Sequence, residues 1–199
     1  NIEISSRTLH FFHPAGTSRG VYTTRKSFYL TLSDSERPGT AGTGECATLP
    51  DLSCDAMPDR QYEQKLRTFC DGFCRTGRID TDAMRPYPSM LFGLETAKAQ
   101  LEAKGSINFF NTPFGRGEEG ITINGLVWMG TFDEMYRRLE AKLEAGFRCV
   151  KLKIGAIDFE KELDLIRHIR QSFTRKQVEL RVDANGGFTP EEALQRLEQ

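Results

Sequence analysis

Cys149-Val-Lys-Leu-Lys-Ile154 is the stretch that decides the fold, because it has the pattern of a short strand with both lysines on one face. Side chains alternate between the two faces of a strand, so Lys151 and Lys153 point to the same side. Apolar residues then recur at helical spacing over residues 159–173, which predicts an amphipathic helix. The stretch and the helix after it therefore form one β/α unit.

The same alternation of strand and helix continues on both sides of this unit. Before it, residues 121–129 are strand-like and residues 132–145 form an amphipathic pattern that Gly146 ends. After it, residues 178–183 read as a third strand, and Thr189 is the expected N-cap of a third helix. A β-α-β-α-β-α order with a period near 30 residues favours a parallel sheet with helical crossovers.

The first part of the chain has a different organisation. Residues 1–50 read as a three-stranded antiparallel sheet with a strand at 27–32, a loop at 14–20 and a glycine-rich hairpin loop at Gly39, Gly42 and Gly44. Helices are predicted over residues 59–74 and from Ser89 to Gly105. Sheet followed by helices predicts an α+β domain over residues 1–118.

Composition narrows the classes of partner. The formal net charge is -1 and the basic residues are spread along the chain, so we expect no nucleic-acid partner. No apolar run approaches the ~20 residues that span a bilayer, and no signal peptide is visible, so we expect no membrane partner. The five irregularly spaced cysteines favour buried free thiols in a reducing cytoplasm, which predicts a cytoplasmic protein. The oligomeric state stays open.

Charged residues stand where two of the predicted parallel strands end. Working residues of β/α barrels lie at the carboxyl ends of the strands. Adjacent ammonium groups on Lys151 and Lys153 repel each other, which favours loss of a proton and gives a usable base. Asp183 ends the next strand, before the permissive turn Ala184-Asn-Gly-Gly187, and suits a hard cation such as Mg²⁺. A base beside such a cation suits removal of a proton next to a carboxylate.

Each of these motifs has an ordinary structural explanation when it is taken alone. Lys-x-Lys on a strand is more often a solvated edge, and an Asp before Gly-Gly is commonly a turn residue. The combination is more specific, because Lys-x-Lys ends one β/α strand, Asp-x-Asn follows the next, and an α+β domain comes first.

Six segments together resemble the enolase superfamily. They are Pro14–Val21, Gly44–Pro50, Pro88–Glu95, Ile123–Met129, Val150–Ile154 and Arg181–Asn185. The resemblance implies an N-terminal α+β capping domain, residues 1–118, followed by a TIM-type (β/α) barrel. Residues 119–199 would hold the first three β/α units of that barrel. Because closure needs eight units, we expect the chain to be incomplete at Gln199.

The resemblance also implies roles for particular residues. Lys153 corresponds to the superfamily's acid/base lysine, and Lys151 to its partner at the substrate carboxylate. Asp183 corresponds to the first of three carboxylate ligands of Mg²⁺, with Mn²⁺ as a possible replacement, and Asn185 lies near the metal. The loop from Ala15 to Gly20 corresponds to a segment that closes over the substrate. Its Ser18 and Arg19, together with Asn185, are the expected substrate contacts.

The implied activity is that of a lyase acting on a small carboxylate. The expected reaction is the syn-dehydration of a cyclohexadiene carboxylate on the route to menaquinone. Two further carboxylate ligands and an opposite lysine are expected on later strands, so residues 1–199 alone should be inactive. The alternatives are an N-acylamino acid racemase or dipeptide epimerase of the same superfamily, and a non-catalytic interaction protein built on a shortened barrel.

Overall fold

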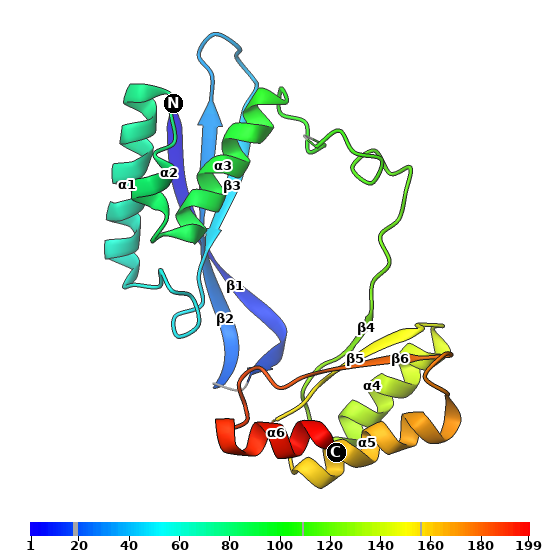
Figure 1. Cartoon of the computed structure of the whole chain (residues 1–199). Coiled ribbons are helices and arrows are strands. Elements are labelled where there is room, and N and C mark those ends of the chain that lie inside the picture. Colours follow the sequence, from blue (N-terminus) through cyan, green and yellow to red (C-terminus); the bar gives the residue numbers. More distant parts are fainter. Residues whose placement is uncertain (18–19, 109, 156) are drawn as a thin grey trace. The chain divides into compact units, whose positions relative to one another are not determined.

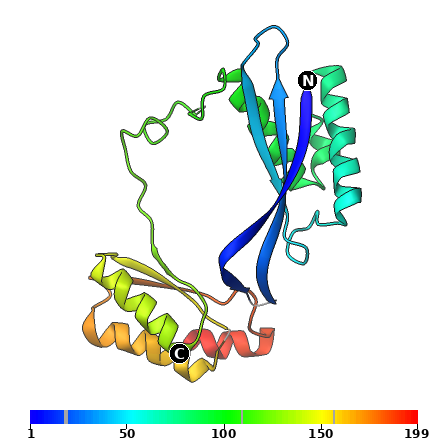
Figure 2. The same cartoon turned by 180° about the vertical axis from the view of Figure 1, so that it is seen from behind.

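The computed structural model describes residues 1–17, 20–108, 110–155 and 157–199, which form two compact units (Figures 1 and 2). The first unit comprises Asn1–His13 and Tyr22–Gly120, and the second comprises Pro14–Val21 and Ile121–Gln199. Along the chain the elements are β1 (Ile2–Thr17), β2 (Gly20–Ser33), β3 (Ala41–Ala47), α1 (Asp59–Thr76), α2 (Thr81–Met84), α3 (Pro88–Glu102), β4 (Gly125–Val127), α4 (Phe132–Glu144), β5 (Cys149–Lys153), α5 (Phe159–Ser172), β6 (Glu179–Asp183) and α6 (Pro190–Glu198).

The sheet of the first unit has the order β1-β2-β3. β2 and β3 are antiparallel, in a register that runs from Ser27 opposite Ala47 to Ser33 opposite Ala41. The predicted antiparallel sheet is therefore present, but its first two strands are longer than expected. Residues 14–17 and Gly20, predicted to lie in a loop, belong to β1 and β2. The β-branched residues that follow Gly20 favour extended backbone, which helps to explain the longer second strand.

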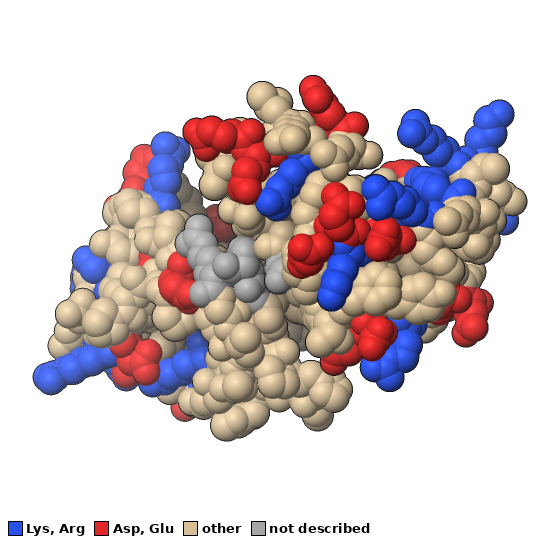
Figure 3. All heavy atoms as spheres, turned by 90° about the horizontal axis from the view of Figure 1, so that it is seen from below, with Lys and Arg blue, Asp and Glu red and all other residues tan. Residues whose placement is uncertain are grey.

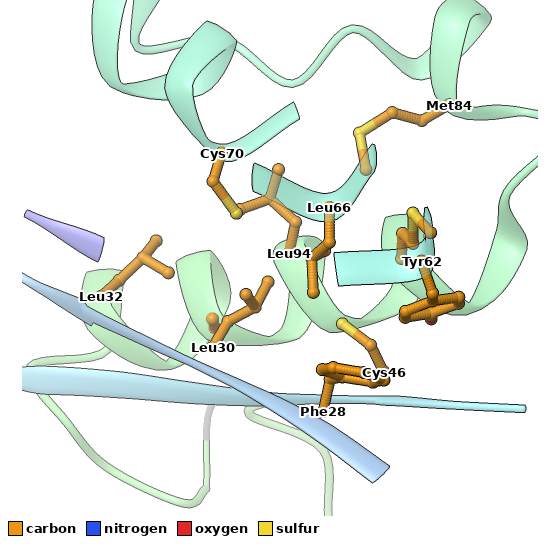
Figure 4. Packing of buried hydrophobic residues seen from close by; sticks show 11 residues of the cluster. Phe28, Leu30, Leu32, Cys46, Tyr62, Leu66, Cys70, Met84 and Leu94 are labelled. Carbon is orange, nitrogen blue, oxygen red and sulfur yellow. The ribbon is translucent and has the colours of Figure 1, made fainter. Parts of the chain in front are cut away.

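The core of the first unit lies between this sheet and its helices. Phe28, Leu30 and Leu32 alternate along β2 and point to the same face, as strand geometry requires. Figure 4 shows them directed toward apolar side chains of the helices, among them Leu66 of α1 and Leu94 of α3. Both leucines are fully buried, in agreement with the helical spacing that predicted α1 and α3.

The boundaries of these helices follow from their capping residues. α1 ends where Gly77 adopts a left-handed conformation and its N–H bonds to the carbonyl of Phe73. α3 begins at Pro88, one residue before the predicted Ser89, because proline fits the first helical position. The short helix α2 was not predicted, since four residues give no periodicity. The side chain of Asp80 caps it by accepting from the N–H of Ala83.

Gly42 and Gly44 lie inside β3 and not in the predicted hairpin loop. The reason is the close approach of α3, since a Cβ on Gly44 would fall on the backbone carbonyl of Gly93. A Cβ on Gly42 would likewise meet the backbone of Ala97. These glycines let helix and strand backbones touch, a use of glycine that strand interiors otherwise disfavour.

Replacement of Gly44 by alanine is expected to lower the free energy of unfolding by about 3 kcal/mol, because neither backbone can move aside without opening the core. Urea unfolding followed by circular dichroism measures the change. Gly120→Ala is the matched control, since a Cβ there meets nothing within 4 Å. Equal midpoints for the two variants would contradict this account of the contact.

The second unit contains a parallel three-stranded sheet in the order β4-β5-β6. Val150 and Leu152 of β5 are fully buried and belong to a core that also includes Leu139 of α4 and Ile169 of α5. Parallel strands, helical crossovers and one helix-covered face agree with the predicted β/α units. Three such units are present in the described residues, as the sequence indicated.

The ends of the elements in this unit depart from the prediction at one strand. β4 covers only Gly125–Val127, whereas residues 121–129 were expected to be strand. Its pairing with β5 runs from Gly125 opposite Val150 to Val127 opposite Leu152, so the flanking residues lack strand partners in this sheet. Thr189 caps α6 as predicted, and the carboxylate of Glu192 accepts from the backbone N–H of Thr189 to complete a capping box.

The surface and the cysteines add three observations. Acidic and basic side chains are interspersed on the face shown in Figure 3. Among the described residues, no helix combines the length and the apolar character that a membrane span requires. All five cysteines are free thiols, but only Cys46 and Cys70 are buried as expected. Cys54 and Cys74 are exposed, and Cys149 is half-buried. Cys74 follows Cys70 by one helical turn, yet only Cys70 reaches the core.

Candidate active site

Three of the predicted site residues, Lys151, Lys153 and Asp183, meet at the carboxyl ends of β5 and β6. Lys153 is the register partner of Asp183 in the parallel pair. Residues that pair in a parallel sheet point to the same face, and Val150 and Leu152 already occupy the face that packs on the helices. Lys151, Lys153 and Asp183 therefore share the face of the sheet that α4 and α5 do not cover.

One carboxylate oxygen joins the two lysines. The Nζ atoms of Lys151 and Lys153 lie 2.7 and 2.8 Å from Oδ2 of Asp183. The side chain of Lys153 is 14% exposed and that of Lys151 is 31% exposed, so Lys153 is the more enclosed of the two. Asp183 thus offsets part of the repulsion between two neighbouring ammonium groups.

Asp183 is held in its ionised form. Hydrogen bonds from Lys151 and then from Lys153 hold the pKa of this carboxyl well below its ordinary value, and the backbone N–H of Asn185 acts in the same direction. That N–H donates to Oδ1 over 3.0 Å. Asn185 has a positive φ of 48°, a conformation that asparagine tolerates better than most residues. The turn therefore aims one backbone donor at the oxygen that the lysines leave open.

The loops that follow the two strands lie in direct contact. A Cβ on Gly187 would come within 3.0 Å of the carbonyl oxygen of Gly155, which follows β5. Glycine at both positions lets the backbones approach. The Asn-Gly-Gly turn that the sequence singled out beside Asp183 consequently has a packing role in addition to its place near the carboxylate.

Trp128 places an aromatic ring at the site. The sequence left open whether this residue lies at the barrel mouth or in the core. Its ring centroid lies 5.8 Å from Nζ of Lys153, within the range of a cation–π contact. Its indole N–H donates to the carbonyl oxygen of Gly16 over 3.0 Å, and Gly16 belongs to the same compact unit. The residue is 37% exposed, so it lies at the rim of the site and not in the core.

Two supporting residues were not singled out from the sequence. The buried carboxylate of Glu162 accepts from the backbone N–H of Gly155 over 2.7 Å and of Ile157 over 3.4 Å, which fixes the loop after Lys153. Arg138 donates to the carbonyl oxygens of Trp128 and Met129 over 3.0 and 2.9 Å. Glu162 stands at helical spacing with Ile166 and Ile169. A charged residue on this apolar face was the feature of the sequence that could have identified it as a buried anchor.

The donor set fits one part of a magnesium site. Asp183 supplies a hard carboxylate oxygen at a strand end, and Mg²⁺ commonly takes one or two carboxylates while keeping several waters. Within the described ranges, no cluster of three or more His, Cys, Asp or Glu side chains could hold a metal ion. Among the described carboxylates at this edge of the sheet, Asp183 is the one that could serve as a ligand. The predicted substrate contacts Ser18 and Arg19 lie outside the described residues.

The arrangement is suited to proton transfer at a carbon acid. Two cationic groups converge with an acidic oxygen on an open sheet face, so an anionic group approaching this face would meet positive charge. The enclosed position of Lys153, against an aromatic ring, limits its contact with water and strengthens local electrostatic interactions. Lys153 is the better placed of the two to exchange a proton, and Lys151 the better placed to meet a charged group.

Comparisons with known proteins agree with this architecture. The family described as enolase C-terminal domain-like matches residues 134–199. A curated relative, the o-succinylbenzoate synthase of Desulfotalea psychrophila, is 38% identical over 98% of this chain and 61% of its own length. The chain therefore spans about three fifths of that relative.

Solved structures give the same fold. The crystal structure of MenC from Desulfotalea psychrophila LSv54 matches all of this chain and 62% of its own, with 31% identity and a TM-score of 0.70. The o-succinylbenzoate synthase of Thermosynechococcus elongatus BP-1, with Mg in its active site, matches 99% of this chain and 56% of its own, at 20% identity and a TM-score of 0.70. The L-Ala-D/L-Glu epimerase of Bacillus subtilis matches 100% and 56%, at 22% identity and a TM-score of 0.63.

Proposed function

The chain belongs to the enolase superfamily, and we propose from this premise that a protein containing it is an o-succinylbenzoate synthase. The reaction would be the syn-dehydration of 2-succinyl-6-hydroxy-2,4-cyclohexadiene-1-carboxylate to 2-succinylbenzoate, a lyase reaction of menaquinone biosynthesis. The observation that carries the proposal is the convergence of Lys151, Lys153 and Asp183 on one open sheet face. The 38% identity to a synthase supports the choice of reaction within the superfamily.

Lys153 would act first as a base and then as an acid. In its neutral form the amine takes the proton from the carbon that bears the carboxylate. The electron pair of that C–H bond becomes the new ring double bond as the neighbouring C–O bond breaks. The departing hydroxide takes the proton back from Lys153 and leaves as water, which restores the neutral amine. A single lysine on one face accounts for a syn elimination.

The other residues would hold charge in place. The Lys151 ammonium would pair with the substrate carboxylate, where negative charge grows as the proton leaves. Asp183 would be one ligand of Mg²⁺, or of Mn²⁺ in its place, with Asn185 shaping the turn beside it. When bound, the metal supplies a Lewis acid that stabilises the developing negative charge. Ser18, Arg19 and Asn185 are proposed as substrate contacts.

The proposal extends to organisation and location. Residues 1–118 would act as a capping domain, and residues 119–199 as the first β/α units of the barrel. The substrate would be a small carboxylate, with neither nucleic acid nor membrane as a partner, and the protein would work in the cytoplasm.

A direct assay tests the reaction. The full-length protein is incubated with the cyclohexadiene carboxylate and either Mg²⁺ or Mn²⁺, and formation of the aromatic product is followed by ultraviolet absorbance. We expect metal-dependent dehydration that is lost with a chelator. A parallel incubation with N-acylamino acids and dipeptides in deuterated water looks for exchange at the α-carbon. Exchange there without any dehydration would contradict the proposal and favour a racemase or epimerase.

A further inference from the structure

We propose that Trp128 is a positioning residue that fastens the backbone at Gly16 beside Lys153. The inference concerns how the proposed site is held together, so its kinetic part rests on the proposed function. Its structural part concerns only the order of the segment around Gly16. The two parts of one side chain make the connection: the indole N–H contacts the segment, and the ring faces the ammonium.

The first contact joins residues that are 112 positions apart in the sequence. The indole Nε1 of Trp128 donates to the carbonyl oxygen of Gly16 over 3.0 Å. Pro14–Val21 belongs to the second compact unit, whereas the preceding part of β1 and the following part of β2 belong to the first. Because a glycine has no side chain to anchor, a backbone hydrogen bond is a direct means of fixing this point.

The second contact lies on the face of the same ring. Nζ of Lys153 is 5.8 Å from the ring centroid of Trp128, and its other described contact is the ion pair with Asp183. An aromatic face attracts a cation and excludes water from it. The ring therefore restricts where the Lys153 ammonium can lie without neutralising it.

Hydrogen bonds from α4 hold the backbone of Trp128 in place. Arg138 of α4 donates to the carbonyl oxygens of Trp128 and Met129, so the backbone at the end of β4 is bound to the helix that follows. The capping box of Thr131 and Glu134 fixes the start of that helix. Because this backbone is constrained, the Trp128 side chain can hold Gly16 and Lys153 at a fixed distance from each other.

Because the two contacts use different atoms, substitutions can separate them. Trp128→Phe keeps an aromatic face and removes the N–H, while Trp128→Leu removes both. Hydrogen–deuterium exchange, read by mass spectrometry on peptides covering residues 14–21, reports the order of the segment whatever reaction the protein catalyses. We expect this exchange to be about five- to tenfold faster in both variants, the size of one net hydrogen bond.

The kinetic arm separates positioning from general damage. For Trp128→Phe we expect KM to rise about fivefold with kcat within about twofold, since only the anchoring of the segment is lost. For Trp128→Leu we expect a further fall in kcat of about tenfold, since Lys153 loses its aromatic wall. Tyr136→Phe, which removes a hydroxyl bonded to His168 elsewhere in the unit, should change none of these values.

Unchanged exchange of residues 14–21 in Trp128→Phe would overturn the inference, as would an equal loss of kcat in both variants. Should Trp128→Phe fail to fold, Trp128→Leu gives the second measurement of exchange in residues 14–21, since leucine has no donor to replace the indole N–H. If the wild-type protein shows no dehydration, the proposed function fails while the exchange experiment still decides the structural part.

Discussion

Replacement of Lys153 by alanine in the full-length protein is expected to lower kcat for dehydration by about 10³- to 10⁴-fold, with a much smaller change in KM. The expectation is large because one amine both removes the proton and returns it to the leaving hydroxide, so its loss affects two bond-breaking events. Steady-state rates of product formation at saturating Mg²⁺ measure the effect. Lys153 is also the more enclosed of the two lysines, which makes water a poor substitute for it.

Two other lysines serve as controls for this experiment. Lys151→Ala is expected to raise KM more than it lowers kcat, because Lys151 is assigned to binding charge. The exposed Lys176, in the loop before β6, should be replaceable without effect. Circular dichroism should show a folded Lys153→Ala protein, since the ion pair of Lys151 with Asp183 remains. Turnover of Lys153→Ala within tenfold of wild type would remove this residue from the proposed mechanism.

Local periodicity explains why the elements of the second unit were predicted well. A strand in which Val150 and Leu152 alternate with lysines has only one way to bury its apolar side. The chain order of the β/α units then places the ends of β5 and β6 together, so the meeting of Lys153 with Asp183 follows from topology. Their roles in a reaction stay predictions.

The errors in the first unit have a different physical origin. Gly42 and Gly44 were assigned to a loop because glycine is usual in turns, but the close approach of α3 requires glycine within the strand. That requirement comes from a helix that begins more than 40 residues later, so no local window contains it. The same limit applies to Trp128, whose partner Gly16 lies 112 positions away.

The role of the Glu162 carboxylate was missed because the periodicity of apolar residues identifies the buried face of a helix but not its hydrogen bonds. Glu162 lies on the buried side of α5, where a carboxylate is costly unless donors reach it. Those donors are backbone N–H groups of the loop after β5, including that of Gly155, and the conformation of a loop is not encoded by periodicity. A charged residue on an otherwise apolar stripe is therefore a useful indication of a structural anchor next to a site.

Asp183→Asn is expected to lower turnover of the full-length protein by about 10³-fold, since several kcal/mol of charge stabilisation depends on the metal that this carboxylate would hold. The substitution keeps the size of the side chain and removes its charge. It also leaves the ammonium groups of Lys151 and Lys153 next to each other without their shared anion. We therefore expect a second effect, a loss of about 1–3 kcal/mol in the free energy of unfolding measured in EDTA.

The two effects of Asp183→Asn can be separated by the concentration of metal. If the carboxylate acts mainly as a ligand, raising Mg²⁺ from about 1 to about 100 mM should recover part of the turnover, because weaker binding is offset by mass action. If it acts only as the counter-charge of the lysines, turnover should not respond to Mg²⁺. Lys151→Met combined with Asp183→Asn should then regain stability, because it removes one of the two repelling charges.

Asp164→Asn is the matched control, because this exposed carboxylate pairs with Arg167 on the helix surface and should change stability by less than about 0.5 kcal/mol. Full wild-type activity of Asp183→Asn at about 1 mM Mg²⁺ would exclude both roles, and the convergence of charge at the ends of β5 and β6 would then be a feature of folding alone.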